Sequence, residues 1–447
     1  MAERATNSYA ELETRILHWI ETEGRERGLA LLDELLQAAR DGEAAMQTIV
    51  AREFFALGYE TDVFTADLDA LASHPEFSLL PELASLGTAN RPNVVARWPG
   101  AGGGRSLFAF AHIDSYILDP ARWSVDPYRV TLAPDGRACG YGIADDRSGI
   151  VGMLLAARAL SAIGVLPGGT VTMASCLGKH LGAGGTLAVM ARGYGGDGAV
   201  YLHPAETGVG LAEYKAVSLG LVQFKITVEG MAPEFREWNQ TPAAHLGINA
   251  IERAANLISG LRHWAGERAT RIHHPAVDAE LGRSTNLNIT TISGGESDRR
   301  VPETCVITGM IAFPPGETVA AVRADFVMAA QKAATSIPGW VDRFPVVEWL
   351  PLMANPGDTD PDGDFARTFV SCLETTTGQT PRVWPAHTAS DIRYPILYAN
   401  APTVGFGPRA GNFGGPDEWL DVDDFLRAVQ CLALLIIRWC GVGGGNR

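Results

Sequence analysis

The stretch GTVTMASCLGKHLGAGGTLAVMARGY, residues 169–194, contains the pattern that decides the fold class. Its first part, GTVTMAS (169–175), consists of small or β-favouring residues and predicts a buried strand. A glycine-rich turn follows, and then GTLAVMARGY (185–194), which favours a helix. A strand that leads through a glycine turn into a helix is typical of α/β enzymes, which bind ligands at such turns. Lys179 and His180 lie in this turn.

The same alternation of strands and helices continues on both sides of this stretch. Strands are predicted at NVVARW (93–98), SLFAFAHI (106–113) and GAVYLH (198–203), and a helix is predicted at RSGIVGMLLAARALSAIG (147–164). Three amphipathic helices are predicted within residues 8–58. Strands that alternate with helices indicate a mixed, mainly parallel sheet flanked by helices.

The pattern changes near Tyr214. From there a strand, a helix, two strands, a helix and a strand are predicted in turn, which is the ferredoxin-like β-α-β-β-α-β order. The first pattern then resumes and ends on a helix at 423–439. We therefore expect a discontinuous α/β catalytic domain over 1–212 and 353–447, with a ferredoxin-like domain inserted at 213–352.

Composition narrows the classes of function. The 447 residues include 46% hydrophobic and 19% charged residues, as in ordinary globular proteins, and the net charge is −15. This charge argues against a nucleic-acid or anionic-membrane partner and leaves a small-molecule substrate as the expected partner. The six cysteines form no CxxC pairs, so reduced thiols are expected. We see no signal-peptide core and no apolar run near the roughly 20 residues of a membrane span, so a cytoplasmic protein is expected.

Residue types that can bind metals occur at two predicted strand ends and in a glycine-rich turn before a predicted helix. AHIDS contains His112 and Asp114, GYGIADDRSG contains Asp145, and VYLHPAETG contains His203. In the H-x-D arrangement the two side chains point the same way, so the histidine can ligate while the carboxylate orients its ring. A lone histidine at a strand end is usually structural, and a lone aspartate before a helix is usually an N-cap. Three such positions at the carboxyl edge of one parallel sheet favour a site instead.

Several blocks in the chain follow one another as in a known family. They are HID, GYGIADDRSG, HLGINAI, TTISGG…RVPETC, SDIR and APTVGFGP…GGPDEW. In these blocks the chain resembles the aminoacylase / carboxypeptidase G / succinyl-diaminopimelate desuccinylase family of dinuclear metallohydrolases, over nearly all of its length from about residue 93. The resemblance implies that the inserted domain is a lid and dimerisation domain. A homodimer through this domain, or a higher homo-oligomer, is therefore expected.

The chain departs from the family pattern at the site itself. Lys179 and His180 stand where the family has two glutamates, the first its general base and the second a metal ligand. His203 replaces the next acidic ligand, and Gly414 stands where the family has its last histidine ligand. The glycine turn therefore lacks the general base and the acidic metal ligand that the family has there.

Two family ligands remain, His112 and Asp145, and together with His203 they form a set of two histidines and one carboxylate. With one carboxylate, a single divalent ion leaves a net charge of about +1, whereas two ions would leave about +3 in a poorly solvated site. We therefore expect one divalent transition metal per subunit, Mn, Zn, Co or Fe. His180 is expected to be either a fourth ligand or a solvent-facing loop residue.

Two further residues are candidates for substrate binding. Arg393 in ASDIRY stands where the family has an active-site arginine, so it either clamps a substrate carboxylate or forms an ion pair with Asp391. His387 in WPAHTAS either faces the site or is structural.

The residues in the glycine turn limit the choice of reaction. A lysine is a poor general base at neutral pH, so amide hydrolysis by the family's route is not expected. An electron-poor aromatic amine needs less help, because its own ring takes up the charge when water replaces the amino group. The favoured prediction is hydrolytic deamination of such an amine bearing a carboxylate, with Lys179, His180 and Asp114 as the catalytic residues. A divergent amidohydrolase, aminoacylase or dipeptidase with His180 as proton shuttle, and a metal-free pseudoenzyme, are the alternatives.

Overall fold

The computed structural model describes residues 2–78, 80, 89–180, 185–204, 207–335 and 344–443, with side chains from residue 9 onward. The chain forms two compact units. The first comprises Met1–Ala216, Gly357–Trp384 and Asp391–Arg447, and the second comprises Val217–Pro356 and Pro385–Ser390. The divisions thus fall at 216/217 and 356/357, where the sequence predicted 212/213 and 352/353. The inclusion of 385–390 in the second unit was not predicted.

A six-stranded sheet with the order β1-β2-β6-β3-β7-β16 forms the centre of the first unit. Strands β6, β3, β7 and β16 run parallel to one another, and β2 and β1 add to the β6 edge in antiparallel fashion. The mixed, mainly parallel sheet is therefore confirmed. Its strands are β1 (Glu60–Thr65), β2 (Pro92–Trp98), β3 (Leu107–His112), β6 (Val171–Cys176), β7 (Gly198–Leu202) and β16 (Thr403–Phe406).

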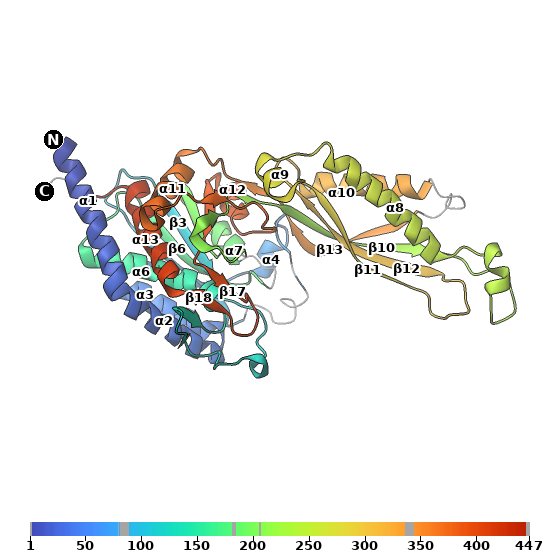
Figure 1. The fold of residues 1–447 in the computed structure, drawn as a ribbon, viewed down its shortest axis with the longest axis horizontal. Coiled ribbons are helices and arrows are strands. Elements are labelled where there is room, and N and C mark those ends of the chain that lie inside the picture. Colours follow the sequence, from blue (N-terminus) through green and yellow to red (C-terminus); the bar gives the residue numbers. More distant parts are fainter. Residues whose placement is uncertain are drawn as a thin grey trace. The chain divides into compact units, whose positions relative to one another are not determined.

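Helices cover both faces of this sheet (Figure 1). The side chains of β3 alternate, so Leu107, Ala109 and Ala111 pack into one core while Phe108 and Phe110 pack into another. The first core is built with α1 (Ala2–Trp19), α2 (Arg25–Ala38), α3 (Glu43–Ala56), α6 (Ser148–Ile163), α11 (Asp364–Thr377) and α13 (Val422–Cys440). The second core is built with α7 (Gly185–Ala191) and α12 (Arg393–Ala399).

One strand of this sheet was missed. The sequence predicted a loop over 63–91, but β1 occupies Glu60–Thr65 and the short helix α4 occupies Leu68–Leu71. β1 lies at the edge of the sheet with every residue exposed or half-buried. An edge strand of this kind needs no hydrophobic run, so its periodicity is weak.

Shorter elements complete the first unit. A four-stranded sheet with the order β17-β18-β5-β4 brings residues far apart in sequence together. Its strands are β4 (Thr131–Leu132), β5 (Arg137–Cys139), β17 (Ala410–Gly411) and β18 (Trp419–Asp421), and a parallel pair is formed by β8 (Glu213–Tyr214) and β15 (Arg382–Val383). All six cysteines, each in the described part of the chain, are free thiols. Among the described residues, no helix has the length and hydrophobicity to cross a bilayer.

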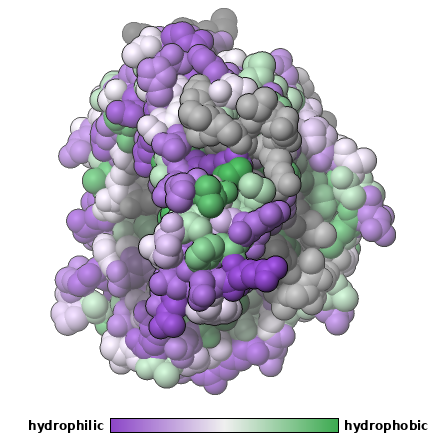
Figure 2. All heavy atoms as spheres, turned by 90° about the vertical axis from the view of Figure 1, so that its right-hand side faces the viewer, coloured by the Kyte–Doolittle hydropathy of each residue, from purple (hydrophilic) through white to green (hydrophobic). Residues whose placement is uncertain are grey.

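The second unit has the predicted β-α-β-β-α-β order. Its strands are antiparallel neighbours in the order β11-β12-β10-β13, and its two long helices pack on one face of the sheet. The elements are β10 (Gly220–Glu229), α8 (Ala250–Ala269), α9 (Pro275–Leu281), β11 (Asn286–Gly294), β12 (Thr304–Phe313), α10 (Val319–Thr335) and β13 (Val346–Ala354). Figure 2 looks onto this unit and shows apolar side chains gathered among hydrophilic ones.

Candidate metal centre

The two predicted histidine ligands end neighbouring strands of the parallel sheet. Phe110 of β3 and Tyr201 of β7 are register partners, so His112 and His203, each two residues further on, come side by side on the same face. Their rings are 5.7 Å apart between centroids, and the row of rings formed by Phe110, Tyr201 and His203 has spacings of 4.9 Å. The regular alternation of the strands therefore places both imidazoles.

Asp145 comes from the loop that leads into α6, and a buried carboxylate holds this loop. Glu418 accepts hydrogen bonds from the backbone N–H groups of Gly142, Ala144 and Asp145 at 3.1, 2.9 and 2.8 Å. Burial and the charge of Asp145 raise the pKa of Glu418 to about 8. Glu418 immediately precedes β18, which pairs with β5, so the small sheet anchors the ligand loop.

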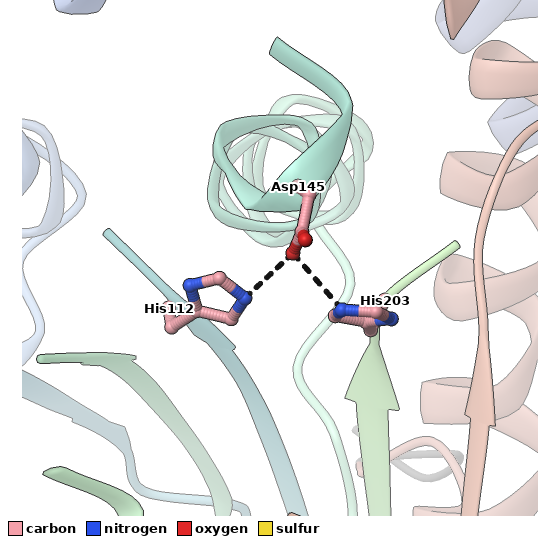
Figure 3. A group of neighbouring side chains, drawn as sticks. All are labelled: His112, Asp145 and His203. Atoms are coloured by element: carbon pink, nitrogen blue, oxygen red, sulfur yellow. Dashed lines mark hydrogen bonds and ion pairs between the residues drawn. The ribbon is translucent and has the colours of Figure 1, made fainter. Parts of the chain in front are cut away.

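These three side chains converge on one point (Figure 3). Oδ1 of Asp145 lies 2.9 Å from Nε2 of His112 and 2.9 Å from Nε2 of His203. One ligand atom of each residue lies within 4.8 Å of the others, and all three residues are buried. Two imidazoles and one carboxylate are a donor set that fits a divalent transition ion. The three residues predicted as metal ligands are therefore brought together by the fold.

The charges around these donors shift their pKa values in opposite directions. Burial and the ammonium groups of Lys179 and Lys215 hold the pKa of His203 well below its usual value. Despite burial, His203 and Lys179 hold the pKa of Asp145 well below its usual value. Burial opposes protonation of His112, but Asp114 and Asp145 raise its pKa to about 10.

Asp114 acts on the glycine turn as well as on His112. Its carboxylate accepts backbone hydrogen bonds from Gly178, Lys179 and His180 at 2.8, 3.2 and 3.0 Å. The atom closest to Nδ1 of His112 is the backbone oxygen of Asp114 at 3.0 Å, and its carboxylate lies at 3.5 Å. The sequence predicted that the carboxylate orients the ring, whereas the carbonyl makes the shorter contact.

Lys179 and His180 both face the cluster. Nζ of Lys179 lies 2.7 Å from Nε2 of His203. Nε2 of His180 lies 3.4 Å from Oδ2 of Asp145, and its side chain is 6% exposed. Of the two alternatives for His180, the solvent-facing loop residue is therefore wrong.

Lys215 and Tyr116 are further residues of this region that the sequence analysis missed, besides Glu418. Lys215 is fully buried, with Nζ 2.8 Å from Nδ1 of His203 and 3.0 Å from the carbonyl oxygen of Pro204. Tyr116 lies over His180 with 4.0 Å between ring centroids. Lys215 could have been noticed as a lysine inside the apolar run at 214–217. Nothing in the local sequence pattern marks Tyr116.

Gly414, at the position of the family's last histidine ligand, lies against the ring of Tyr116. Its φ is +63°, in the left-handed region that favours glycine, and an added Cβ would overlap the tyrosine ring. No side chain fits at this position while Tyr116 keeps its place. The position of Tyr116 therefore leaves no room for a histidine at residue 414.

Arg393 is engaged by acidic side chains. Its Nε lies 3.1 Å from Oε2 of Glu76, and its Nη1 lies 3.6 Å from Oδ1 of Asp391. The ion pair with Asp391 that the sequence left open is therefore present, and Glu76 is a second partner that was not predicted. His387 is half-buried in the second unit, where its carbonyl oxygen accepts from Leu219 N at 2.9 Å.

Replacing Arg393 by methionine should lower the free energy of unfolding by about 3–5 kcal/mol, because two buried carboxylates lose their partner. Urea unfolding measures this change. The matched control is Arg192→Met, which removes a half-exposed arginine paired with Asp62 at 2.9 Å and should cost about 1 kcal/mol or less. A normal stability of Arg393→Met combined with a raised KM would instead assign Arg393 to the substrate.

The fold and the cluster together define a class of protein. A parallel-sheet unit with two histidine donors at its strand ends and an aspartate donor before a helix, interrupted by a ferredoxin-like unit, is the architecture of a metallopeptidase-type hydrolase. Residues 109–438 match Peptidase family M20/M25/M40, and the chain belongs to this family.

Individual relatives are distant. N-formyl-4-amino-5-aminomethyl-2-methylpyrimidine deformylase of Halalkalibacterium halodurans is 24% identical over 367 residues, which cover 78% of this chain and 83% of the relative. Acetylornithine deacetylase of Vibrio parahaemolyticus is 24% identical over 353 residues, covering 79% and 85%. The aminopeptidase PepT structure from Bacillus cereus superimposes with a TM-score of 0.68 at 18% identity and covers 92% of this chain and 98% of its own.

Proposed function

We propose that this protein hydrolyses a C–N bond of a small carboxylate-bearing molecule, with one divalent transition ion held by His112, Asp145 and His203. Their donor atoms face one another from buried positions, which supports binding of a single ion. Such an ion would supply Lewis acidity and lower the pKa of a nearby water.

A second ion fits the neighbouring residues poorly. Oδ2 of Asp145 faces His180, the adjacent position carries the ammonium of Lys179, and the ring of Tyr116 fills the space at Gly414. His180, Lys179 and Tyr116 add no carboxylate to that of Asp145, and a second ion would need further carboxylates to offset its charge. This supports one ion per subunit.

The single observation that carries the proposed reaction is the place of the Lys179 ammonium beside the donors of the metal centre. Its Nζ lies 2.7 Å from Nε2 of His203, the atom that would bind the ion, so a bound ion would replace this contact and leave the ammonium next to the site. An ammonium donates hydrogen bonds and stabilises negative charge, but it does not take a proton from water. The residue therefore suits a substrate that becomes anionic during the reaction. Hydrolytic deamination of an electron-poor aromatic amine is such a reaction: water oxygen bonds to the ring carbon, the C–N bond breaks, and ammonia leaves. A 5-nitroanthranilate-like substrate supplies the nitro group and the carboxylate.

Amide hydrolysis is the second candidate, favoured by the deformylase and deacetylase names of the relatives. His180, 3.4 Å from Asp145, would then carry the proton to the departing amine. A protein that binds a ligand without turnover is the third candidate.

Product analysis separates these candidates. The purified protein, loaded in turn with Mn, Zn, Co or Fe, is incubated with 5-nitroanthranilate and with N-acetylornithine. We expect ammonia and the hydroxy compound in equal amounts from the arylamine, and no deacetylation. Deacetylation alone would support the amidohydrolase, and no turnover with any metal would support the ligand-binding protein.

We further propose that the second unit mediates a homodimer. β11 is an edge of its sheet, and Ile292 on this strand is 51% exposed. An edge strand with an exposed apolar side chain is suited to pair with a second copy.

Ile292→Lys should therefore shift the protein from dimer to monomer, because the lysine introduces a charge at the paired edge. Light scattering at several concentrations measures the change. The control is Met328→Lys, an exposed apolar residue on α10, which should leave the dimer intact. An unchanged dimer in Ile292→Lys would exclude this edge.

A further inference from the structure

A small pocket opens in the first unit. It is lined by residues of the segments 117–123 and 414–416, together with Tyr141, and its volume is about 40 Å³. This is room for about three water molecules, since one needs roughly 10–15 Å³. A carboxylate or nitro group fits such a space, whereas an aromatic ring is too large for it.

Tyr116 connects this pocket with the metal centre. Gly414, one wall of the pocket, packs against the Tyr116 ring, and Tyr141, another wall, donates from its hydroxyl group to the Tyr116 carbonyl oxygen at 2.6 Å. The Tyr116 ring also contacts His180, with 4.0 Å between ring centroids and 41° between the ring planes, and Nε2 of His180 faces Asp145. The Tyr116 side is also open to solvent, because this residue is 49% exposed. A planar molecule can therefore lie against the exposed part of the ring with one end in the pocket.

Arg122 supplies the positive charge of the pocket. It is exposed, and it ends the short helix Pro120–Arg122. Asp119, the acidic residue of the lining, caps that helix by accepting from Ala121 N at 3.2 Å. Arg393, for which the sequence left open a substrate carboxylate or an ion pair with Asp391, pairs with both Glu76 and Asp391. A guanidinium group binds a planar carboxylate through two parallel hydrogen bonds.

We infer that this pocket binds the acidic group of the substrate: Arg122 binds the carboxylate, and the aromatic ring of the substrate lies against Tyr116. The ligand class is a planar aromatic carboxylate. The inference rests on the proposed function for the bond that is cut, but the binding site itself can be tested without turnover.

Binding of two unreactive probes tests the site. 3-Nitrobenzoate carries the ring and the carboxylate without an amino group, and nitrobenzene lacks the carboxylate as well. Arg122→Gln should weaken binding of 3-nitrobenzoate about tenfold and leave nitrobenzene unaffected, because one charged hydrogen-bonded contact is lost. Tyr116→Leu should weaken both probes by about threefold to tenfold, whereas Tyr116→Phe should bind both like the wild type, because it keeps the ring. Calorimetric titration measures these changes.

Two controls match these variants. Tyr398 is 40% exposed and contacts His74 edge to face at 4.5 Å between ring centroids, so Tyr398→Leu removes a similar tyrosine elsewhere in the first unit. Arg40→Gln removes an exposed arginine that pairs with Asp126. Both should bind the probes like the wild type.

The inference is overturned if the wild type does not bind 3-nitrobenzoate, if Arg122→Gln binds it normally, or if the controls lose as much affinity. If Arg122→Gln weakens binding of 3-nitrobenzoate as expected but the wild type does not deaminate the arylamine, the pocket is supported and the proposed reaction is overturned. If the wild type deaminates the arylamine but Arg122→Gln binds 3-nitrobenzoate normally, the proposed reaction is supported and the pocket is overturned.

Discussion

Replacement of His203 by alanine should reduce the metal content of the purified protein from about one ion per chain to nearly none, and His112→Ala should do the same. Each variant removes one of three donors whose atoms lie within 4.8 Å of one another. The remaining histidine and carboxylate bind a transition ion too weakly to survive desalting. Because a catalytic ion stabilises the transition state by several kcal/mol, and about 1.4 kcal/mol is tenfold in rate, kcat/KM should fall by about 10³-fold.

Elemental analysis after saturation and desalting measures the metal content. The control is His263→Ala, which removes an exposed histidine on α8 of the second unit and should keep the metal. The melting temperature of the metal-free proteins shows whether the variants fold. A folded His203→Ala protein that keeps a full ion would exclude this donor set. Two tightly bound ions in the wild type would contradict the single-ion proposal.

The sequence predicted those parts of the site that follow from local regularity. His112 and His203 end buried strands, and the period of the strands puts them on the same face of the sheet as Phe110 and Tyr201. Asp145 follows from a glycine-rich turn before a long helix. These signals lie within a few residues of each ligand, so a single sequence is sufficient to find them.

Contacts between distant segments could not be predicted in this way. Glu76 meets Arg393 across 317 positions of the chain, and Glu418 meets Asp145 across 273. No local period encodes such pairs, because they depend on how the sheet and its loops close. Lys215 is a related case: its backbone pairs with Gly405 of β16, and this pairing carries its side chain to His203. A lysine in an apolar segment marks an unusual position without naming its partner.

Substitutions of Lys179 distinguish the proposed deamination from amide hydrolysis, its main alternative. Lys179→Met removes the ammonium that lies 2.7 Å from His203 and keeps much of the side chain's length. If this ammonium stabilises charge that develops on an aromatic ring, kcat for 5-nitroanthranilate should fall about 100-fold with little change in KM. The control is Lys225→Met on β10, which removes a half-buried lysine paired with Glu348 and should leave both constants unchanged.

Lys179→Glu should have opposite effects under the two reactions. On the arylamine it should lower kcat further than Lys179→Met, because a carboxylate would then face the developing anion. On N-acetylornithine it should raise turnover if the protein is an amidohydrolase, since a carboxylate can take a proton from water beside the donors of the metal centre. Steady-state kinetics of both variants on both compounds measure these effects. A gain on the arylamine in Lys179→Glu, or full activity in Lys179→Met, would show that the ammonium does not stabilise the transition state.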